Sequence, residues 1–329
     1  MALVSDDDLP FVANPGVTVW RVLDERTLDR RFLYYWMQTQ DFLRQVWAVA
    51  GSTDTFPYVS LTQQRKLLVA IPPIDVQRSI APILRILDDK IELNRRMNET
   101  LEAMARAIFQ DWFVAFGATR AKIAGCPPYL AADLWALFPD SLDGDCPSGW
   151  ASAQLLDLCQ LKRGYDLPSA QRRNGPVPIV SSSGLSGFHD QAMSEGPGVV
   201  TGRYDTVGQV FFVDGPFWPL NTALYVADFK MNNPRFVFHT LRGLAFDVYS
   251  DKGAVPGINR NDLHQARVVI APAPIQAAFA ATTDALSARV ASNETESETL
   301  AATRDLLLPR LMSGELRVKD AERVLAAGA

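Results

Sequence analysis

The chain has 329 residues, of which 48% are hydrophobic and 21% charged, and its formal net charge is −5. This is the composition of a globular protein rather than a disordered chain, and the length predicts about two domains. A pI near 5.3 argues against a protein that coats nucleic acid through bulk positive charge.

The N-terminus has neither a basic region nor an apolar core, so we expect no secretory signal. No apolar run approaches the ~20 residues that a membrane span requires. The three cysteines, Cys126, Cys146 and Cys159, match neither a disulfide framework nor a zinc motif. We therefore expect a reduced, cytoplasmic chain with no membrane contact.

Two stretches of the chain repeat each other. Residues 51–71 align with residues 250–270 at a constant offset of 199, and the alignment continues without a gap into the segments that follow. Upstream, Arg31-Phe32 aligns with Arg235-Phe236 at an offset of 204. An ungapped match of this length indicates an internal duplication. Identical pairs in the main register include Pro57 and Pro256, Val69 and Val268, Gln77 and Gln276, Leu87 and Leu286, and Leu101 and Leu300.

The two copies are unequal. Copy two begins near Gly149-Trp150 and runs for about 60 residues before its repeated part starts, and copy one has nothing that corresponds. We therefore expect residues 1–70 to be a partial first copy of a domain whose complete form spans residues 149–270.

Residues 71–148 are predicted to form a central helical spacer and linker. From Asp75 to Phe116 the only Gly or Pro is Pro82, which falls in the first turns. The apolar residues follow a 4-3 spacing, which is typical of a coiled-coil arm and predicts a helix of ~40 residues. They are Val76, Ile80, Ile83, Leu87, Met97, Leu101, Met104 and Ile108.

Residues 149–270 are broken by Gly and Pro into short runs rich in β-branched and aromatic residues, such as Val177–Val180, Gln209–Val213 and Ala223–Val226. Regularly spaced turn signals between such runs predict a compact, mainly β domain. One helix is expected between the strands, over residues 232–249.

Residues 271–329 repeat the helical pattern from Gln276 to Leu308 and are predicted to be a C-terminal helical spacer. Two such arms in one chain are expected to pair antiparallel within the molecule. The predicted fold class is therefore α+β, with mainly β domains of small helix content joined by two long helices in an antiparallel coiled coil.

Asn94 and Asn293 occupy the same seam position in the two arms. A polar residue in a helical seam costs stability but fixes the register, because a slipped pairing would bury an unpaired amide. We expect the two asparagines to lie close together, with Lys90 facing Glu296 one turn away. The alternative is a pair of solvated asparagines on frayed helices.

Motifs for catalysis are absent. The chain has no G-x-x-x-x-G-K-[ST] loop for nucleotides and no G-x-S-x-G nucleophile elbow. Asn233-Pro234-Arg235-Phe236 resembles the Asn-Pro-Pro-aromatic motif of amino methyltransferases but lacks the second proline. The three histidines, His189, His239 and His264, have no metal-ligand spacing. We therefore expect a non-catalytic chain that binds no metal.

Motifs at the helix ends carry a family resemblance. Ile71–Gln77, followed by the long helix and then Phe109–Phe113, resembles the central repeat of the specificity (S) subunits of type I restriction-modification enzymes. Leu307–Val318 resembles their C-terminal repeat. Gly202-Arg203 and Phe217–Thr222 are similar to the body of their target recognition domains.

The resemblance implies a DNA-binding subunit that does no chemistry and binds no cofactor itself. Each target recognition domain would read one half of a split sequence of double-stranded DNA. The helical spacers would fix the distance between the halves and dock two methyltransferase (M) subunits, which bind S-adenosylmethionine and methylate adenine. A restriction (R) subunit would translocate and cleave DNA with ATP and magnesium.

One departure from the family pattern is the first recognition domain, which starts partway through. The resemblance then implies complementation by another chain, pairing with a second S chain, or a decayed copy. A competing function is a coiled-coil scaffold or antagonist that occupies M subunits without reading DNA.

Candidate DNA contacts lie in Gly-rich and polar loops of residues 150–270. This segment has 11 Lys and Arg against 10 Asp and Glu, whereas the rest of the chain has 21 against 27. Arginine in such loops suits guanine and asparagine suits adenine, although a solvated surface role is open for each residue. The candidates are Lys162, Arg163, Arg172, Arg173, Asn174, Arg203, Tyr204, Asn221 and Lys252.

An aromatic cluster, Trp112, Phe113 and Phe116, lies at the end of the first arm. Exposed aromatic side chains are typical anchors of protein interfaces. We expect these three side chains to pack either on the recognition domain or on an M subunit.

Overall fold

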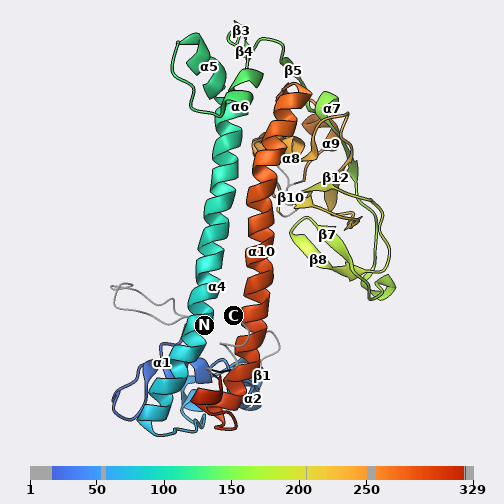
Figure 1. Cartoon of the computed structure of the whole chain (residues 1–329). Helices are drawn as coiled ribbons and strands as arrows, with labels where there is room; N and C mark the ends of the chain where they lie inside the picture. The colour runs from blue at the N-terminus through green and yellow to red at the C-terminus, as the bar shows by residue number, and fades with distance from the viewer. Residues whose placement is uncertain (1–16, 53–56, 205, 250–256, 322, 324–329) are drawn as a thin grey trace. The chain divides into compact units, whose positions relative to one another are not determined.

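The computed structural model describes residues 17–52, 57–204, 206–249, 257–321 and 323 (Figure 1). The chain divides into two compact units, of which unit 1 comprises Met1–Glu99 and Val290–Ala329 and unit 2 comprises Thr100–Arg289. Two long helices, α4 (Ile74–Phe109) and α10 (Ala273–Met312), each contribute residues to both units.

Unit 1 is mostly helical in the part that the structure describes. Its short helices have side-chain caps, since Asp29 accepts hydrogen bonds from the first turn of α1, Thr39 caps α2, and Ser60 forms a capping box with Gln63 in α3. The elements besides the long helices are α1 (Arg30–Trp36), α2 (Gln40–Val49), β1 (Gly51–Ser52), β2 (Pro57–Tyr58) and α3 (Leu61–Gln64).

This helical content differs from the mainly β head that the sequence predicted for the first copy. The strands of copy two lie mostly in the segment without a counterpart in copy one, as shown by β6 (Gln160–Arg163) through β9 (Gly198–Gly202). The repeated segment instead contains short helices: at the offsets of the repeat, α1 and α3 correspond to α8 (Pro234–Arg242) and α9 (Arg260–Leu263). In the described residues, the part of the domain that copy one shares with copy two is therefore mainly helical.

The core of unit 1 joins α1 to both long helices. Phe32 of α1 is fully buried against Ile80 and Leu84 near the start of α4 and against Leu307 and Leu311 near the end of α10. Burying such side chains contributes about 1.5–3 kcal/mol each, so this cluster stabilises unit 1.

Polar contacts join α4 and α10 within unit 1. The guanidinium of Arg304 donates to the Asp88 carboxylate at 2.8 Å, and the Asn94 amide donates to the main-chain oxygen of Asn293 at 3.3 Å. Because residue numbers rise along α4 as they fall along α10, the two helices run antiparallel in this unit.

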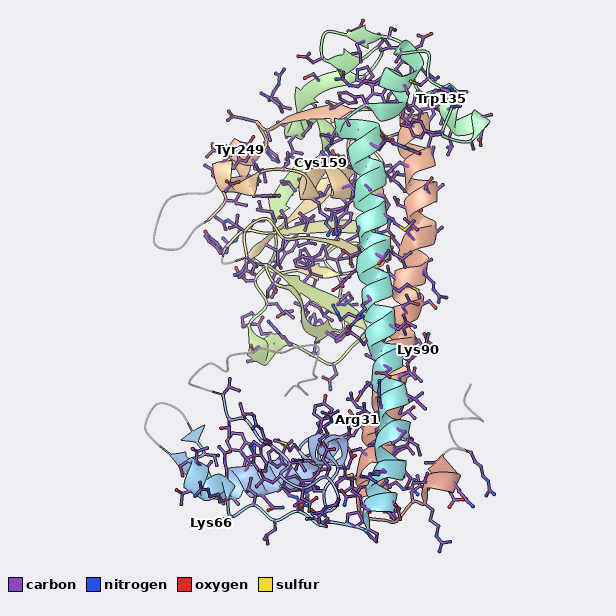
Figure 2. All side chains as sticks on the ribbon, turned by 90° about the vertical axis from the view of Figure 1, so that its left-hand side faces the viewer. Arg31, Lys66, Lys90, Trp135, Cys159 and Tyr249 are labelled. Carbon is purple, nitrogen blue, oxygen red and sulfur yellow. The ribbon has the colours of Figure 1, made fainter. Side chains whose placement is uncertain are left out.

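The expected ion pair between Lys90 and Glu296 is present, with 3.1 Å between the Lys90 Nζ and the carboxylate (Lys90 is labelled in Figure 2). Asn293 donates to the side-chain oxygen of Asn98 at 2.7 Å, and both Asn94 and Asn293 are buried. The two asparagines are therefore members of one polar network rather than solvated groups.

Unit 2 contains the sheets. It begins with the end of α4, which continues as a π-helical turn, and it ends with the start of α10. Its elements are η2 (Gln110–Val114), α5 (Gly117–Ile123), α6 (Ala132–Leu137), β3 (Leu142–Asp143), β4 (Cys146–Pro147), β5 (Ala151–Gln154), α7 (Leu155–Leu158), β6 (Gln160–Arg163), η3 (Ser169–Gln171), β7 (Val177–Ser181), β8 (Gly184–His189), β9 (Gly198–Gly202), β10 (Val210–Val213), β11 (Trp218–Pro219), β12 (Ala223–Asp228), α8 (Pro234–Arg242), η4 (Phe246–Tyr249), α9 (Arg260–Leu263) and β13 (Arg267–Ile270).

An antiparallel sheet with the strand order β10-β9-β12-β6 forms the centre of unit 2. A second sheet has the order β11-β7-β8, and β13 pairs antiparallel with β5, which closes the domain by joining its first and last strands. Strand β9 is buried along its whole length, as expected for a central strand of apolar, β-branched residues.

None of the helices in the described residues is both long and apolar enough to span a bilayer.

Candidate nucleic-acid interface

A pocket of about 450 Å³ lies in unit 2, where three segments that are distant in the sequence meet. These segments are the end of β6 with its neighbour in β12, the residues after β9, and the stretch that leads into α9. The lining residues are Arg163, Leu224, Arg203, Tyr204, Gly257, Ile258, Asn259, Arg260 and Asn261.

The sheet fixes the first two segments. Arg163 ends β6 and lies opposite Leu224 of β12, which itself pairs with β9. Arg203 directly follows β9, and its main-chain N–H donates to the oxygen of Thr222 at 3.1 Å. The residue between strand and loop is Gly202, where a Cβ would lie 2.2 Å from the Thr206 oxygen. Only glycine therefore allows this close approach of the backbone.

Main-chain contacts hold the third segment against the second. The N–H of Ile258 donates to the Arg203 oxygen at 3.0 Å, and Tyr204 forms a β-bridge with Gly257. A Cβ on Gly257 would lie 2.7 Å from the Tyr204 ring. The tyrosine ring therefore packs on bare backbone, and the pocket wall is set by contacts that any larger residue would disturb.

The charge of the lining is positive. Three of the lining residues are arginines and none is acidic. Arg163 lies 3.9 Å from Asp166, both at exposed positions, and the guanidinium of Arg203 stacks over the Tyr204 ring at 4.6 Å. Among the described residues, Arg203 and Arg260 have no carboxylate within ion-pair distance. The pocket is therefore suited to an anion.

A second basic group of the predicted set lies in the loop between η3 and β7, which packs against β8. Arg172 donates to the Ser186 oxygen at 2.9 Å, and its buried Nε has no hydrogen-bond partner among the described residues. Arg173 pairs with Asp190 at 3.0 Å, whereas Asn174 is exposed. These three residues contribute nothing to the pocket lining.

The remaining predicted contacts are Asn221, Lys162 and Lys252. Asn221 accepts from the Arg163 Nε through its main-chain oxygen at 3.3 Å and donates through its side chain to Asp166. Lys162 is exposed on β6. Lys252 lies outside the described residues. The structure thus brings together Arg163, Arg203 and Tyr204, with Asn221 beside them.

Sequence reasoning missed the third wall, Asn259, Arg260 and Asn261. Asn259 caps α9 by accepting from the Asn261 N–H at 2.9 Å. The repeat held a signal for this wall, because its counterpart in copy one is Ser60-Leu61-Thr62, which keeps the cap but has no positive charge.

The aromatic cluster at the end of α4 is buried within unit 2. Trp112, Phe113 and Phe116 are 3%, 4% and 8% exposed, and the Phe113 ring packs on Phe236 with 4.8 Å between centroids. Trp112 packs edge-on against Phe279 of α10 at 6.1 Å. The cluster therefore packs on α8 and α10 within unit 2.

The three histidines are also interior groups. His264 accepts from the Leu161 N–H at 3.0 Å, His189 accepts from the Arg173 N–H at 3.1 Å, and His239 stacks on the Phe109 ring at 5.6 Å. Within the described residues, no three His, Cys, Asp or Glu side chains are grouped to hold a metal ion.

Comparisons with known proteins agree with one family. The sequence model described as "Type I restriction modification DNA specificity domain" matches residues 2–103 and 147–302, well over half of the chain. The MjaIX specificity subunit of Methanocaldococcus jannaschii is 25% identical over 336 residues, which cover 94% of this chain and 74% of that protein. The HindI specificity subunit of Haemophilus influenzae is 24% identical, covering 85% and 75%.

A solved structure has a similar fold. It is a crystal structure of a type I restriction-modification S subunit from M. genitalium, with a TM-score of 0.57 and 19% identity, covering 88% of this chain and 74% of that one. The family model, which matches most of the sequence, assigns the chain. It belongs to the family of type I restriction-modification DNA specificity proteins.

Proposed function

We propose that this chain gives a type I restriction-modification complex its DNA sequence specificity, and that residues 149–270 of unit 2 read one half of a split target. The single observation that carries the proposal is the arginine-lined pocket in a chain whose net charge is −5. A cationic surface formed by three separate segments on an acidic protein is best explained by an anionic polymer as ligand.

The two basic groups suit two kinds of contact. Phosphate contacts position a protein on DNA, whereas contacts with base edges specify the sequence. The loop that leads into β7 carries Asn174 at an exposed position beside Arg172 and Arg173. The hairpin β7–β8 that follows is a two-stranded ribbon, and such a ribbon fits the major groove of B-DNA. We assign sequence reading to this loop and the hairpin after it.

In this proposal α4 and α10 form an antiparallel coiled coil that spaces the recognition domains, with Asn94 and Asn293 fixing its register. Residues 1–70 contribute to a first recognition domain, and residues 71–148 and 271–329 are spacers. The helices also dock the M subunits. Ile86 and Leu93 of α4 support this role, because they lie on one helix face and are 63% and 52% exposed.

The chain itself does no chemistry in this proposal. Methylation belongs to the M subunits with S-adenosylmethionine, and cleavage belongs to the R subunit with ATP and magnesium. The chain supplies double-stranded DNA recognition and the geometry of assembly.

Methylome sequencing tests the proposal, with the gene present and with it deleted. We expect deletion to remove one split adenine-methylation motif. A strain that expresses a variant with Asn174→Ala should change the bases of that motif or lose it, because Asn174 is assigned to base reading. An unchanged methylome after deletion would reject the proposal in favour of a scaffold that does not read DNA.

A further inference from the structure

We propose that the arginine-lined pocket of unit 2 holds a phosphodiester group of the DNA backbone, with Arg260 and Arg203 as its principal ligands. The inference rests on the proposed function, and deepens it by separating a positioning site in the pocket from base reading elsewhere. It also gives a role to the Asn259–Asn261 segment, which the sequence motifs left unassigned.

The concave shape favours a phosphate over a base edge. In a B-form duplex the base edges are recessed within the grooves, so they are reached by protruding elements such as helices and β-ribbons. Phosphate groups project from the surface of the duplex and can enter a hollow in a protein. The pocket is a hollow of about 450 Å³ between the sheet and the segment before α9, which leaves ample room for a phosphate with its flanking sugars.

The charge balance of the lining favours an anion with several acceptor oxygens. Three arginines line the pocket and none of the lining residues is acidic. Among the described residues, Arg163 alone of the three has a carboxylate near it, at the long distance of 3.9 Å from Asp166. A phosphodiester presents two charged oxygens, which match the paired N–H groups of arginine.

The ligands are held in place before DNA arrives. Arg203 is fixed through main-chain hydrogen bonds to Thr222 and Ile258, and its guanidinium is aligned by the Tyr204 ring. Arg260 begins α9, whose first turn is fixed by the Asn259 cap. Because the backbone at these positions is set by these contacts, binding loses little backbone freedom.

The first copy lacks the corresponding charge. At the offset of the repeat, Arg260 aligns with Leu61, which is exposed at the start of α3. The phosphate contact is therefore a property of the second copy, and the two copies differ in how they bind DNA.

Methylphosphonate scanning tests the inference. The full chain is assembled with its M subunits and bound to a duplex that carries the methylated motif, and a single backbone phosphate is replaced by neutral methylphosphonate in each of a series of duplexes. For the wild type we expect one phosphate whose replacement weakens binding about tenfold, as for loss of a charge-assisted hydrogen bond.

The Arg260→Gln complex should bind the duplexes that keep this phosphate more weakly, and replacing the phosphate should weaken its binding no further. Its log–log salt slope should be smaller by about one. Its methylated motif should stay the same. The matched control is Arg267→Gln, which removes an equally exposed arginine of unit 2 outside the pocket and should keep the sensitivity at that phosphate. Arg163→Gln, at the opposite wall, provides a second variant with the expected loss.

Two results would overturn the inference. A changed methylation motif in the Arg260→Gln strain would make the pocket a base-reading site. An Arg260→Gln complex with the wild-type affinity for every duplex of the scan would show that the pocket lies outside the DNA interface. The proposed function would survive that result, because the wild-type complex would still bind DNA. A wild-type complex that binds no DNA would instead reject the proposed function itself.

Discussion

Gln77 and Gln276 lie 199 positions apart in the sequence and make the same hydrogen bonds at the starts of the two long helices. The side-chain oxygen of Gln77 accepts from the N–H of Asp29, and that of Gln276 accepts from the N–H of Asn233, each at 2.8 Å. Asp29 and Asn233 are the N-caps of α1 and α8. Each glutamine therefore ties a long helix to a capped short helix of its own unit.

The amide nitrogens complete the same pattern. The Nε2 of Gln77 donates to the Pro72 oxygen and that of Gln276 to the Ala271 oxygen, each at 2.7 Å. Both side chains are buried, with 0% and 3% exposed. A buried amide whose hydrogen bonds are all made orients its neighbours, and its removal leaves polar groups without water.

We expect Gln77→Met and Gln276→Met each to lower the free energy of unfolding by about 1–3 kcal/mol, because each leaves a main-chain N–H and a main-chain carbonyl in a part-buried or buried place without a partner. Urea unfolding followed by tryptophan fluorescence measures the change. The control is Gln265→Met at an exposed glutamine, which should stay within about 0.5 kcal/mol of the wild type. Methionine variants as stable as this control would show that the two amides are dispensable.

Sequence reasoning found this relationship only in part. The repeat aligned Gln77 with Gln276, since the offset is constant along the long helices. It did not pair either glutamine with its cap, because Asp29 and Asn233 follow a different offset of 204 and lie more than 40 positions from the glutamines. Contacts between distant segments are set by packing, which local patterns do not encode.

The polar network between Asn94 and Asn293 gives a second prediction. Asn94 also donates to Glu296 at 2.8 Å and to Ser297 at 3.3 Å, while the side-chain oxygen of Asn293 has no partner among the described residues. Replacing both asparagines by leucine removes the network as a unit, so the double variant should lose less stability than the sum of the two single variants.

Cross-linking reports the register directly. A carbodiimide should join the paired side chains of Lys90 and Glu296 in the wild type, and mass spectrometry of the digest identifies the product. In the Asn94→Leu, Asn293→Leu variant we expect this product to fall and cross-links to other carboxylates of α10 to rise. Thr295→Ala, at an exposed position of α10, should leave the pattern unchanged. A double variant with the wild-type pattern would assign the register to other contacts.

The buried aromatic cluster gives a third prediction. Trp112→Ala should lower the free energy of unfolding of unit 2 by about 3–5 kcal/mol, because it opens a cavity between Phe113, Phe138 and Phe279. Val114→Ala is the matched control two residues away, where the side chain is 50% exposed and the change should be small. Denaturant unfolding measures the free energy of unfolding of both variants. Equal values would mean that the Trp112 side chain contributes no more to the core than Val114 does.

The candidate site shows the same limit of sequence reasoning. Arg163 and Arg203 were predicted because each lies beside a glycine, which is a local signal. Arg260 was not, since nothing near it in the sequence indicates that the chain returns to β9 at Gly257. The cluster of Trp112, Phe113 and Phe116 was found as a motif, but only the packing of α8 and α10 around it decides that it faces inward.

The burial of His239 gives a pH dependence. Desolvation, with smaller contributions from Arg242, Arg235 and Arg106, lowers the pKa of His239 to about 3. An unfolded histidine titrates near pH 6.5, so between these two values the unfolded chain binds a proton that the folded chain does not. The stability associated with neutral His239 is therefore complete above about pH 6.5 and is lost progressively as the pH falls toward 3.

His264 has the same sign, because burial and then Arg260 lower its pKa, and its neutral Nε2 is needed to accept from Leu161. Each such histidine adds up to about 1.4 kcal/mol per pH unit to the decrease in the free energy of unfolding as the pH falls. Urea unfolding at several pH values between 7.5 and 5 measures the slope, in a range where most carboxylates stay ionised.

Phenylalanine binds no proton, so the His239→Phe variant takes up one proton fewer on unfolding. Its free energy of unfolding should therefore depend less steeply on pH below 6.5. The comparison of slopes, rather than of absolute stabilities, isolates the histidine from the packing changes that the larger ring introduces between Phe109, Phe238 and Phe279. Parallel slopes for the wild type and the variant would mean that His239 takes up its proton within the folded protein, and that its aromatic surroundings admit water or a counter-charge.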